Sequence, residues 1–575
     1  MARADGMSEL ARQVLGLAER MAPGADARLR ELCALAVEAV GDGGNSCVGL
    51  DEAAGRTWRE VLDAMRGEGV EGEGGEGDGE AFPDAATLEA MARAAPELVD
   101  GDGSTGASFV LAGGAVYTRR NYLYERYVER RLREMAAIPD REGAAVPEGA
   151  LGLDAGAQRE AVELMSRRGF SLLSGGPGTG KTYTVVRAMA LALKDNPDLR
   201  ILLMAPTGKA ADRLNESLAR ALGDLAKEAE WKEVAEGIPT DAQTIHRALG
   251  GRDGQFAHGP DDPLACDWAI VDEASMVDLP LFAKLLAALP EGCRLTLVGD
   301  PNQLASVERG RIFKDLCQLA RAGGMLEGCL ATLAKSHRFG DDDAIGRLAG
   351  AILSGDAAEV RGALAAGGAN TRYRGACGAA LARNPGFAEA VREAFGELAA
   401  AKTPGEALSA LGKGRVLCAM RTGNCGAEAL NEAMEKMPFL RDAPKPWMVT
   451  ANDHDLKLYN GNVGVSMPGE PEKVWFAGQT PGVLRCVHRA LLPDLVPAWC
   501  LTVHKSQGSE YERVLMVLSD NPKVRVLTRE LLYTGVTRAK KRVDLWGSGE
   551  ALARCVGNPT RRRSGLANGG EARGG

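Results

Sequence analysis

Short apolar segments alternate with longer amphipathic segments along the middle of the chain. Four apolar segments have the length of buried strands: 170–175, 201–206, 267–275 and 294–300. Three segments that separate them have apolar residues at helical spacing: 182–194, 208–227 and 278–289. Buried strands that alternate with helices predict a parallel sheet covered by helices on both faces. The same alternation begins again at 415–420 and continues at 513–519 and 542–548, which predicts a second α/β domain.

Two other regions depart from this alternation. Residues 446–500 are rich in Pro and Gly between short strand-like segments, which predicts a small β insertion within the second α/β domain. Residues 1–115 contain an amphipathic helix at 27–40 and are predicted to form a mainly helical N-terminal domain. Residues 67–80 consist largely of Gly and Glu, a composition that buries too little apolar surface to order itself and predicts a solvated loop.

The segment 117–135 alternates aromatic with basic residues at a spacing that suits a helix. Two interpretations of it stay open. The pattern favours a linker helix that packs its tyrosines on the next domain, but stacked and basic side chains also suit a single-strand binding surface. The end of the chain, 557–575, contains RRRSG and Gly repeats and is predicted to be disordered.

The composition of the 575 residues, with 45% hydrophobic and 5% aromatic residues, is that of a multidomain globular protein. No apolar run approaches the roughly 18–20 residues of a membrane helix. The first residues carry charges where a signal peptide needs an apolar core, so we expect a cytoplasmic protein with no membrane contact. The twelve cysteines form no CxxC pair. We therefore expect neither disulfides nor a zinc or iron–sulfur site.

The net charge of −9 neither supports nor excludes DNA as a partner. Seven carboxylates lie between Glu68 and Asp84 with no Lys or Arg among them, so the rest of the chain is close to neutral. A protein that slides along DNA cannot be strongly basic, because neutralised phosphates set its affinity.

A complete phosphate-loop pattern follows the apolar segment 170–175 and opens the next helix. Its residues are Gly175, Gly176, Pro177, Gly178, Thr179, Gly180, Lys181 and Thr182. A strand before the loop and a helix after it are the context in which this pattern binds nucleotide phosphates. The backbone N–H groups then surround a phosphate at the positive end of the helix. Lys181 is expected to neutralise β- and γ-phosphate oxygens, and the Thr182 hydroxyl to ligate Mg²⁺.

Two later strands are expected to bring polar side chains to the same sheet edge. Asp272 and Glu273 end the strand at 267–275, where Asp272 suits a Mg²⁺ ligand and Glu273 suits the group that orients or deprotonates the attacking water. Gln303 follows the next strand and is a candidate sensor of the γ-phosphate, although a simple strand-to-turn role explains it equally well. Gln158, upstream of the loop, is a weak candidate for reading adenine.

An ATPase becomes a motor when a second domain completes its site. Arg338, in KSHRF, and Arg538, in LYTGVTRAK, are the candidates for arginine fingers that stabilise the charge of the transferring phosphoryl group. A single arginine is more often a surface charge, so the surrounding motifs decide the interpretation.

The motifs in order resemble those of superfamily 1 helicases. They are GGPGTGKT, APTGKAADRL (205–214), QTIHRALG (243–250), IVDEAS, VGDPNQLASVERG (298–310), KSHRF, LTVHKSQGSEY (501–511) and LYTGVTRAKK (532–541). VHKSQGSE with VTRAK is similar to the RecD family, the alpha subunits of exodeoxyribonuclease V, and so are SCVGLDEAAG (46–55) and 109–125. Gly535, where the family usually has Ala, and Tyr183 are departures that remove no catalytic group.

The resemblance implies an α/β fold of two RecA-like P-loop NTPase domains, an SH3-like insertion and ATP with Mg²⁺ as cofactors. It implies the following domains: 1–115 for partner docking, 116–149 as a linker helix, 150–340 as the first RecA-like domain, 341–445 and 501–556 as the second, 446–500 as the insertion and 557–575 as the tail. It implies translocation 5′ to 3′ along single-stranded DNA and a complex with beta (RecB-like) and gamma (RecC-like) subunits that processes double-strand DNA ends.

The resemblance also assigns residues to ligands. Thr207, Lys209, Thr244 and His246 match positions of the first domain that face DNA, and His504, Lys505, Ser506 and Gln507 match the motif of the second domain that couples DNA to nucleotide. Glu510 matches a nucleotide-binding position. Without these motifs, the two histidines would be interpreted as hydrogen-bonded structural residues.

Three alternatives predict other features. A free-standing RecD-like helicase would carry N-terminal helix-hairpin-helix modules, and the sequence has no GxG-centred hairpin pair. A scaffold that only binds nucleotide would have lost Lys181, Glu273 or the arginines. A nuclease would need an acidic cluster followed by a Gln-x-Lys pattern, which is not found outside the ATPase motifs, and the resemblance places DNA cleavage in the beta subunit.

Overall fold

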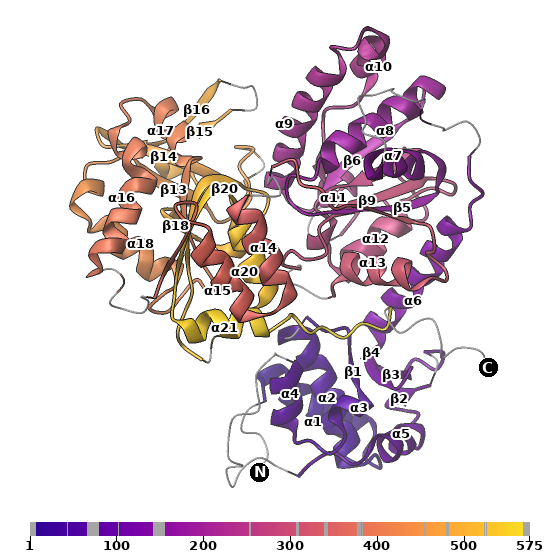
Figure 1. The fold of residues 1–575 in the computed structure, drawn as a ribbon. Coiled ribbons are helices and arrows are strands. Elements are labelled where there is room, and N and C mark those ends of the chain that lie inside the picture. The colour runs from indigo at the N-terminus through magenta and orange to yellow at the C-terminus, as the bar shows by residue number, and fades with distance from the viewer. Residues whose placement is uncertain are drawn as a thin grey trace.

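Three bodies make up the chain: an N-terminal domain and two larger lobes that lie side by side above it (Figure 1). The computed structural model describes residues 7–42, 44–65, 80–101, 103–141, 146, 156–251, 255–305, 310–338, 343–375, 381, 383–453, 455–478, 482–522, 524 and 526–566. Within these residues, no helix has the length and apolar character needed to cross a membrane.

In the described part of the first lobe, six strands form a parallel sheet in the order β10-β5-β9-β8-β6-β7. Their bounds are β5 (Phe170–Gly175), β6 (Ile201–Ala205), β7 (Gln243–Thr244), β8 (Trp268–Val271), β9 (Arg294–Gly299) and β10 (Leu330–Leu333). The helices are α7 (Ala157–Arg167), α8 (Lys181–Asp195), α9 (Gly208–Leu225), α10 (Lys232–Gly237), α11 (Ile245–Ala248), α12 (Leu279–Ala288) and α13 (Ile312–Ala322). Separate apolar cores fill the two faces of the sheet, one beneath α7–α9 and the other beneath α12 and α13.

The described part of the second lobe repeats this design with five parallel strands in the order β11-β20-β19-β12-β18. The strands are β11 (Thr371–Arg374), β12 (Gly414–Cys418), β18 (Cys500–Thr502), β19 (Tyr511–Val517) and β20 (Ala539–Trp546). The helices are α14 (Ala344–Ser354), α15 (Ala357–Ala366), α16 (Pro385–Ala400), α17 (Pro404–Leu411), α18 (Ala427–Glu435), α19 (Val503–Ser506), α20 (Arg529–Val536) and α21 (Gly549–Gly557). Two helix-covered parallel sheets confirm the predicted α/β class.

A separate antiparallel sheet interrupts the second lobe. Its described strands, in the order β16-β15-β14-β13-β17, are β13 (Lys445–Val449), β14 (Val463–Met467), β15 (Glu470–Ala477), β16 (Leu484–His488) and β17 (Leu495–Pro497). The insertion has a small core of its own around Trp447 and Phe476. Its likeness to an SH3 domain stays a prediction.

The N-terminal domain combines helices with a small sheet. The helices are α1 (Glu9–Met21), α2 (Ala27–Asp42), α3 (Leu50–Ala53), α4 (Trp58–Met65) and α5 (Ala85–Arg93), and the strands are β1 (Cys47–Gly49), β2 (Val99–Asp100), β3 (Phe109–Ala112) and β4 (Ala115–Thr118). The predicted helix at 27–40 is α2, whose apolar face lies in the domain core. The predicted Gly/Glu loop lies outside the described residues, except for Glu80.

Helix α6 (Arg119–Ala136) joins this domain to the first lobe, as the alternation of aromatic and basic residues predicted. It packs against α12 and contributes Val128, Leu132 and Met135 to the core on that face of the first lobe. Tyr124 and Tyr127 pack on the same core but are only partly buried. The packing interpretation of this helix is therefore confirmed, although aliphatic side chains make most of the contact.

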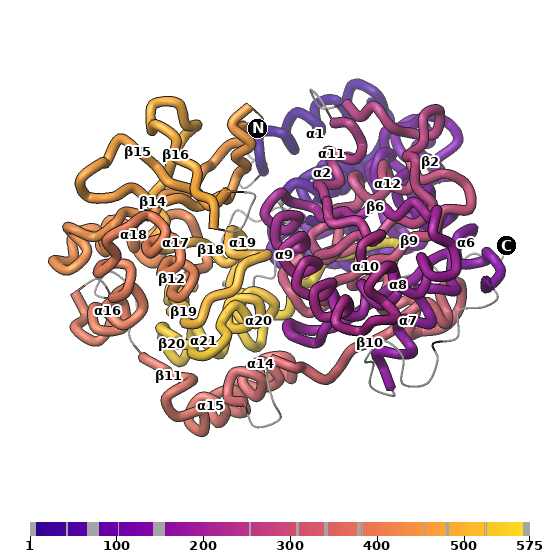
Figure 2. Tube along the Cα trace, turned by 90° about the horizontal axis from the view of Figure 1, so that it is seen from above, coloured from indigo at the N-terminus to yellow at the C-terminus, as the bar shows by residue number. Residues whose placement is uncertain are grey.

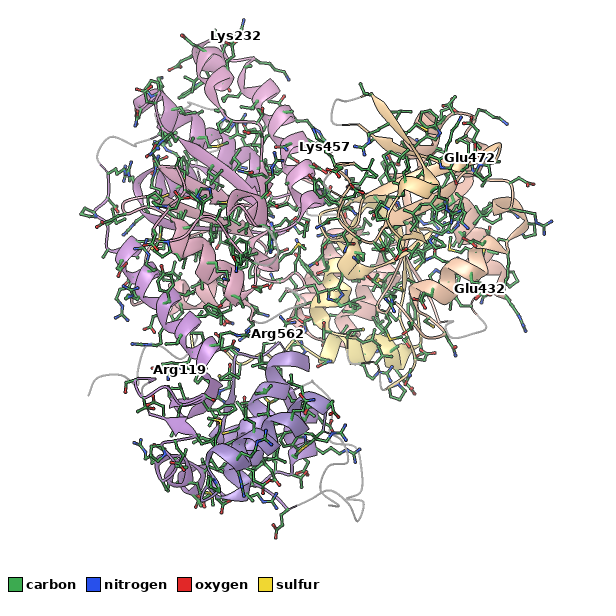
Figure 3. All side chains as sticks on the ribbon, turned by 180° about the vertical axis from the view of Figure 1, so that it is seen from behind. Arg119, Lys232, Glu432, Lys457, Glu472 and Arg562 are labelled. Atoms are coloured by element: carbon green, nitrogen blue, oxygen red, sulfur yellow. The ribbon has the colours of Figure 1, made fainter. Side chains whose placement is uncertain are left out.

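The predicted disordered tail is wrong for residues 558–566, which we call the C-terminal strap. The strap runs from α21 across the junction of the lobes to the N-terminal domain (Figures 1 and 3). Arg562 donates to the carbonyl of Gly310 at 2.9 Å, and Arg563 pairs with Asp51 at 2.9 Å. At the far end, the backbone N–H of Gly565 donates to the buried Glu125 carboxylate at 3.1 Å. These partners are distant in sequence, so the local Arg- and Gly-rich composition gave no sign of them.

Candidate active site

The phosphate loop connects the end of β5 to the start of α8. Gly178 and Gly180 have φ of +76° and +84°, the left-handed region that glycine adopts without strain. The Lys181 ammonium donates to the carbonyls of Gly175 at 2.7 Å and Gly176 at 3.0 Å. The loop therefore holds this cation at the positive end of α8, where anions bind most favourably.

A cavity of about 210 Å³ opens between the phosphate loop and the second lobe. Most of the predicted nucleotide-site residues line it: Pro177, Gly178, Thr179, Gly180, Lys181, Thr182, Asp272, Glu273, Gln303, Arg338, Glu510 and Arg538. Gly175 and Gly176 line an adjoining space of about 520 Å³, which shares Pro177 and Thr179 with the first cavity. The fold therefore gathers side chains that are up to about 360 positions apart in the chain around one cavity.

The two acidic residues follow β8 directly. The Asp272 carboxylate accepts from the Glu273 N–H at 2.8 Å, and Glu273 has a left-handed backbone with φ 50° and ψ 38°. A non-glycine residue in this region is strained, a feature that clusters at functional sites. Burial, and then the charge of Glu273, raises the pKa of Asp272 to about 6.

The donor atoms beside the loop fit a magnesium ion. The Thr182 hydroxyl and the Asp272 carboxylate line the same cavity and are oxygen donors, which Mg²⁺ prefers when it also binds water and phosphate oxygens. Among the residues that the structure describes, no group of three or more His, Cys, Asp and Glu side chains forms a metal-binding cluster.

Arg538 reaches the first lobe from the second. It is almost completely buried, and its guanidinium donates to the Gln303 side-chain oxygen at 3.0 Å and to the Thr534 carbonyl at 3.2 Å. Burial lowers the pKa of Arg538. The structure thus brings the predicted γ-phosphate sensor and one predicted finger into direct contact across the interface.

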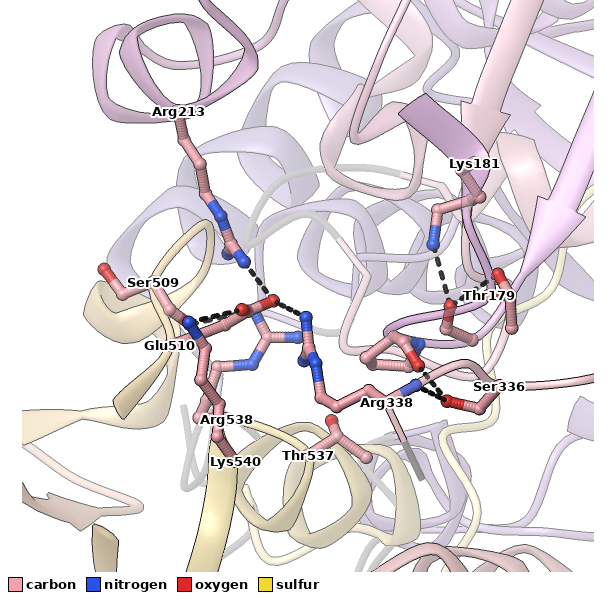
Figure 4. Close-up of polar contacts among 12 residues, drawn as sticks. Thr179, Lys181, Arg213, Ser336, Arg338, Ser509, Glu510, Thr537, Arg538 and Lys540 are labelled. Atoms are coloured by element: carbon pink, nitrogen blue, oxygen red, sulfur yellow. Dashed lines mark hydrogen bonds and ion pairs between the residues drawn. The ribbon is translucent and has the colours of Figure 1, made fainter. Parts of the chain in front are cut away.

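A cluster of cations surrounds Glu510, a residue of the second lobe that also lines the cavity (Figure 4). Arg338 lies 2.6 Å from the Glu510 Oε1 atom, Arg213 pairs with the same atom, and Lys540 lies 3.4 Å from Oε2. Burial works to raise the pKa of Glu510, but Arg213 and Arg338 outweigh it and hold this pKa at about 2. The carboxylate is therefore a fixed negative charge between the lobes.

Further contacts join the loop after β9 to α20. The Tyr533 hydroxyl donates to Asp300 at 3.0 Å, and the Leu304 N–H donates to the Thr534 hydroxyl at 2.8 Å. Asp300 also accepts from the Asn302 N–H at 3.0 Å, so it orders its own loop. The loop that carries Gln303 is therefore bonded directly to α20.

Gln158 lies outside both cavities. Its side-chain nitrogen is 3.3 Å from the His337 Nε2 atom, and it lies so close to Gly180 that an added Cβ there would meet it at 2.8 Å. Gln158 therefore adjoins the phosphate loop beside KSHRF, and its contact with adenine stays a prediction.

Of the four predicted DNA-facing residues of the first lobe, Lys209 reaches the junction with the second lobe. The hydroxyls of Thr207 and Thr244 cap α9 and α11 by accepting from Ala210 N–H at 3.2 Å and Arg247 N–H at 3.1 Å. His246 is exposed at the start of α11, and Lys209 donates to the Lys505 carbonyl at 3.4 Å. Seen from above, α9 and α19 meet at this point (Figure 2).

The four predicted residues of the second lobe separate into two pairs. Lys505 is exposed and His504 is half-buried, and burial followed by Arg562 lowers the pKa of His504 to about 4. Ser506 and Gln507 are buried, and Gln507 donates to the Leu304 carbonyl at 2.8 Å. The Ser506 hydroxyl donates to the Val503 carbonyl of its own helix at 2.7 Å, so only Gln507 of this pair bridges the lobes. A contact of either residue with DNA stays a prediction.

The insertion also reaches this junction, which the sequence did not indicate. Lys505 donates to the Asn460 side-chain oxygen at 2.6 Å, and the Tyr459 ring packs so closely on Gly208 that an added Cβ would meet it at 3.1 Å. Lys457 lies in the same loop between the lobes (Figure 3).

Arg213 is the main site residue that the sequence analysis missed. It lies in the quoted motif APTGKAADRL, four residues after Lys209 and hence on the same face of α9, which was the available signal. Its contact with Glu510 depends on a residue almost 300 positions away, so only the folded chain identifies it.

Comparisons with known proteins agree with this arrangement. Residues 158–309 match the AAA domain family and residues 497–545 match the UvrD-like helicase C-terminal domain. RecBCD enzyme subunit RecD of Mycolicibacterium smegmatis is 35% identical over 94% of this chain and 93% of its own length. The RecD subunit of Haemophilus influenzae is 34% identical over 71% of each chain. The ATP-dependent RecD2 DNA helicase of Deinococcus radiodurans is 30% identical over 76% of this chain but only 56% of its own length. With two lobes closed around a phosphate loop and relatives matched over nearly their full length, this chain belongs to the RecD family of RecBCD enzyme subunits.

Proposed function

We propose that this chain is an ATP-dependent DNA helicase of the RecBCD type that moves 5′ to 3′ along single-stranded DNA in the cytoplasm. One observation carries the proposal: both lobes contribute charged side chains to a single cavity beside the phosphate loop. Such a site changes its contacts when nucleotide binds or is hydrolysed, and it therefore converts ATP turnover into movement of one lobe against the other.

The predicted catalytic residues that line the cavity each have a proposed part in hydrolysis. Lys181 neutralises the β- and γ-phosphates, and Glu273 orients the attacking water and accepts its proton. Arg338 and Arg538 stabilise the charge that develops on the phosphoryl group, and Gln303 senses the γ-phosphate. Thr182 and Asp272 would hold Mg²⁺, which supplies charge neutralisation at the phosphates.

The path from nucleotide to DNA is proposed to run through the interface. Gln303 contacts Arg538 at the nucleotide, and the next residue, Leu304, accepts from Gln507. Gln507 is two positions from Lys505, which is exposed at the junction with Lys209. Contacts to phosphate and sugar along this junction suffice, because a translocating motor must not prefer a sequence.

Strand polarity tests the proposed direction. A duplex with a 5′ single-stranded tail should be unwound in the presence of ATP and Mg²⁺, and a duplex of the same sequence with a 3′ tail should stay paired. Strand separation is measured through a fluorescent label on the displaced strand. Unwinding of the 3′-tailed duplex alone would contradict the proposed direction but not the ATPase.

The N-terminal domain is proposed to dock the other subunits, a RecC-like gamma chain and through it a RecB-like beta chain. Helix α1 exposes Leu10, Leu17 and Met21 to 55%, 46% and 41%, and their spacing places them on one face. An exposed apolar stripe of this kind is typical of a surface that binds another protein. A free-standing helicase, the alternative suggested by the RecD2 relative, has no need for this surface.

Substituting both leucines with aspartate should separate this chain from its partners. Each buried leucine contributes about 2 kcal/mol, so Leu10→Asp with Leu17→Asp should weaken the complex by more than about a hundredfold. DNA-dependent ATPase of the isolated chain should be unchanged. Co-purification of the three tagged subunits measures the effect, and deletion of residues 1–115 should abolish assembly completely.

A matched control is Leu491→Asp, which changes a leucine of the insertion that is 67% exposed. This variant should assemble normally. If the truncated chain still assembles with the gamma and beta subunits, the N-terminal domain belongs to the motor and not to the interface.

A further inference from the structure

We propose that Arg213 is a positioning residue for ATP hydrolysis: it anchors the segment Ser509–Glu510 to the first lobe, and this segment orients both arginine fingers. The inference rests on the proposed ATPase function and adds a residue that has no part in it so far. Arg213 comes from α9, whereas Ser509 and Glu510 precede β19 of the second lobe. Their ion pair therefore crosses the interface.

The segment contacts each finger by a different atom. The Glu510 carboxylate binds the Arg338 guanidinium at 2.6 Å, and the Ser509 carbonyl accepts from Arg538 at 3.4 Å (Figure 4). Arg213 itself approaches the same carboxylate oxygen as Arg338. Two guanidinium groups on one oxygen restrain the carboxylate more firmly than either does alone. In addition, the second lobe cannot turn against the first without breaking the ion pair between Arg213 and Glu510.

The environment makes this pairing stronger than an ordinary surface ion pair. The side chain of Glu510 is 10% exposed, and those of Arg213 and Arg338 are 28% and 20% exposed. Charges that are partly shielded from water interact more strongly than exposed ones. Removing Arg213 would leave Glu510 held by Arg338, beside the phosphate loop, and by Lys540 of its own lobe, so the segment would lose its anchor on α9.

Loss of this anchor should affect the transition state more than ground-state binding. A displacement of the fingers on the scale of an ångström costs about ten- to a hundredfold in rate. We therefore expect Arg213→Ala to lower kcat for DNA-stimulated ATP hydrolysis by about ten- to a hundredfold, with KM for ATP changed less than about threefold. Arg213→Lys keeps the charge and should recover part of the loss.

The matched control is Arg220→Ala on the same helix, two turns further along. Arg220 is 76% exposed and pairs only at 3.7 Å with Glu216 among the described residues. It should retain the wild-type kcat. Melting curves of all variants identify any loss of folding.

A double-mutant cycle with Glu510→Gln separates positioning from direct contact. If Arg213 acts through Glu510, the double variant should be within about twofold of Glu510→Gln alone. The proposal would be overturned by two results together: the losses of kcat in the two single variants multiply in the double variant, and Arg213→Ala binds a non-hydrolysable ATP analogue at least about tenfold more weakly. Arg213 would then touch the nucleotide itself. An unchanged kcat in Arg213→Ala would also overturn it.

Lys181→Ala in the same assay separates this inference from the function on which it rests. If that variant hydrolyses ATP normally, the proposed ATPase site is wrong. If it is inactive while Arg213→Ala is normal, the ATPase site stands and only the positioning role of Arg213 fails.

Discussion

Lys181→Ala is expected to lower DNA-stimulated ATP hydrolysis at least about a hundredfold, the usual effect of removing one preorganised electrostatic stabiliser. The phosphate loop holds the Lys181 ammonium at the start of α8, where it donates to two loop carbonyls. Alanine keeps the helix and leaves the glycines in their left-handed conformations, so the fold should survive.

The measurement is the steady-state rate of phosphate release with and without single-stranded DNA. Lys194→Ala is the matched control, because this lysine lies in the last turn of the same helix and pairs with Glu230 on the surface. It should turn over ATP at the wild-type rate. A Lys181→Ala variant with nearly normal turnover would remove Lys181 from the mechanism.

Arg538→Ala is expected to lower kcat by about a thousandfold, near the lower end of the range for arginine fingers, while leaving nucleotide binding largely intact. A finger acts on charge that exists only in the transition state, so the rate falls more than the affinity. Arg338→Ala should behave in the same way. Unwinding of a 5′-tailed duplex should be lost together with hydrolysis in both variants.

Binding of a fluorescent ATP analogue and single-turnover hydrolysis separate the two effects. Because Arg538 is buried and bonded to Thr534 and Gln303, Arg538→Lys is needed as a second variant that keeps a charge in the core. Arg441→Ala, on the exposed surface of the second lobe, is the control and should be fully active. If either variant unwinds DNA at the wild-type rate, the arginine that it lacks is a structural charge and not an arginine finger.

The sequence predicted those parts of the fold that depend on local pattern. The strands β5, β6, β8 and β9 were expected from apolar segments, and α6 from its helical spacing, because burial and periodicity are written in neighbouring residues. The phosphate loop was equally accessible, since its glycines and its lysine lie within eight positions of one another.

The remaining features depend on partners that are far apart in the chain. Nothing near Arg213 indicates Glu510, and nothing near Gln507 indicates that its side chain is buried against Leu304. The tail looked disordered because its arginines and glycines have no local counter-charges, but Asp51, Glu125 and Gly310 supply acceptors after folding. Long-range ion pairs of this kind leave no periodic trace in a single sequence.

The C-terminal strap also changes how force passes through the molecule. The N-terminal domain is tethered twice, to the first lobe by α6 and to the second lobe by the strap. The N-terminal domain therefore bridges the two lobes. A change in the angle between the lobes would therefore strain either the C-terminal strap or the packing of α6 on the first lobe. If the lobes move as proposed, a partner that holds the N-terminal domain from outside is expected to resist that movement without touching either the nucleotide or the DNA.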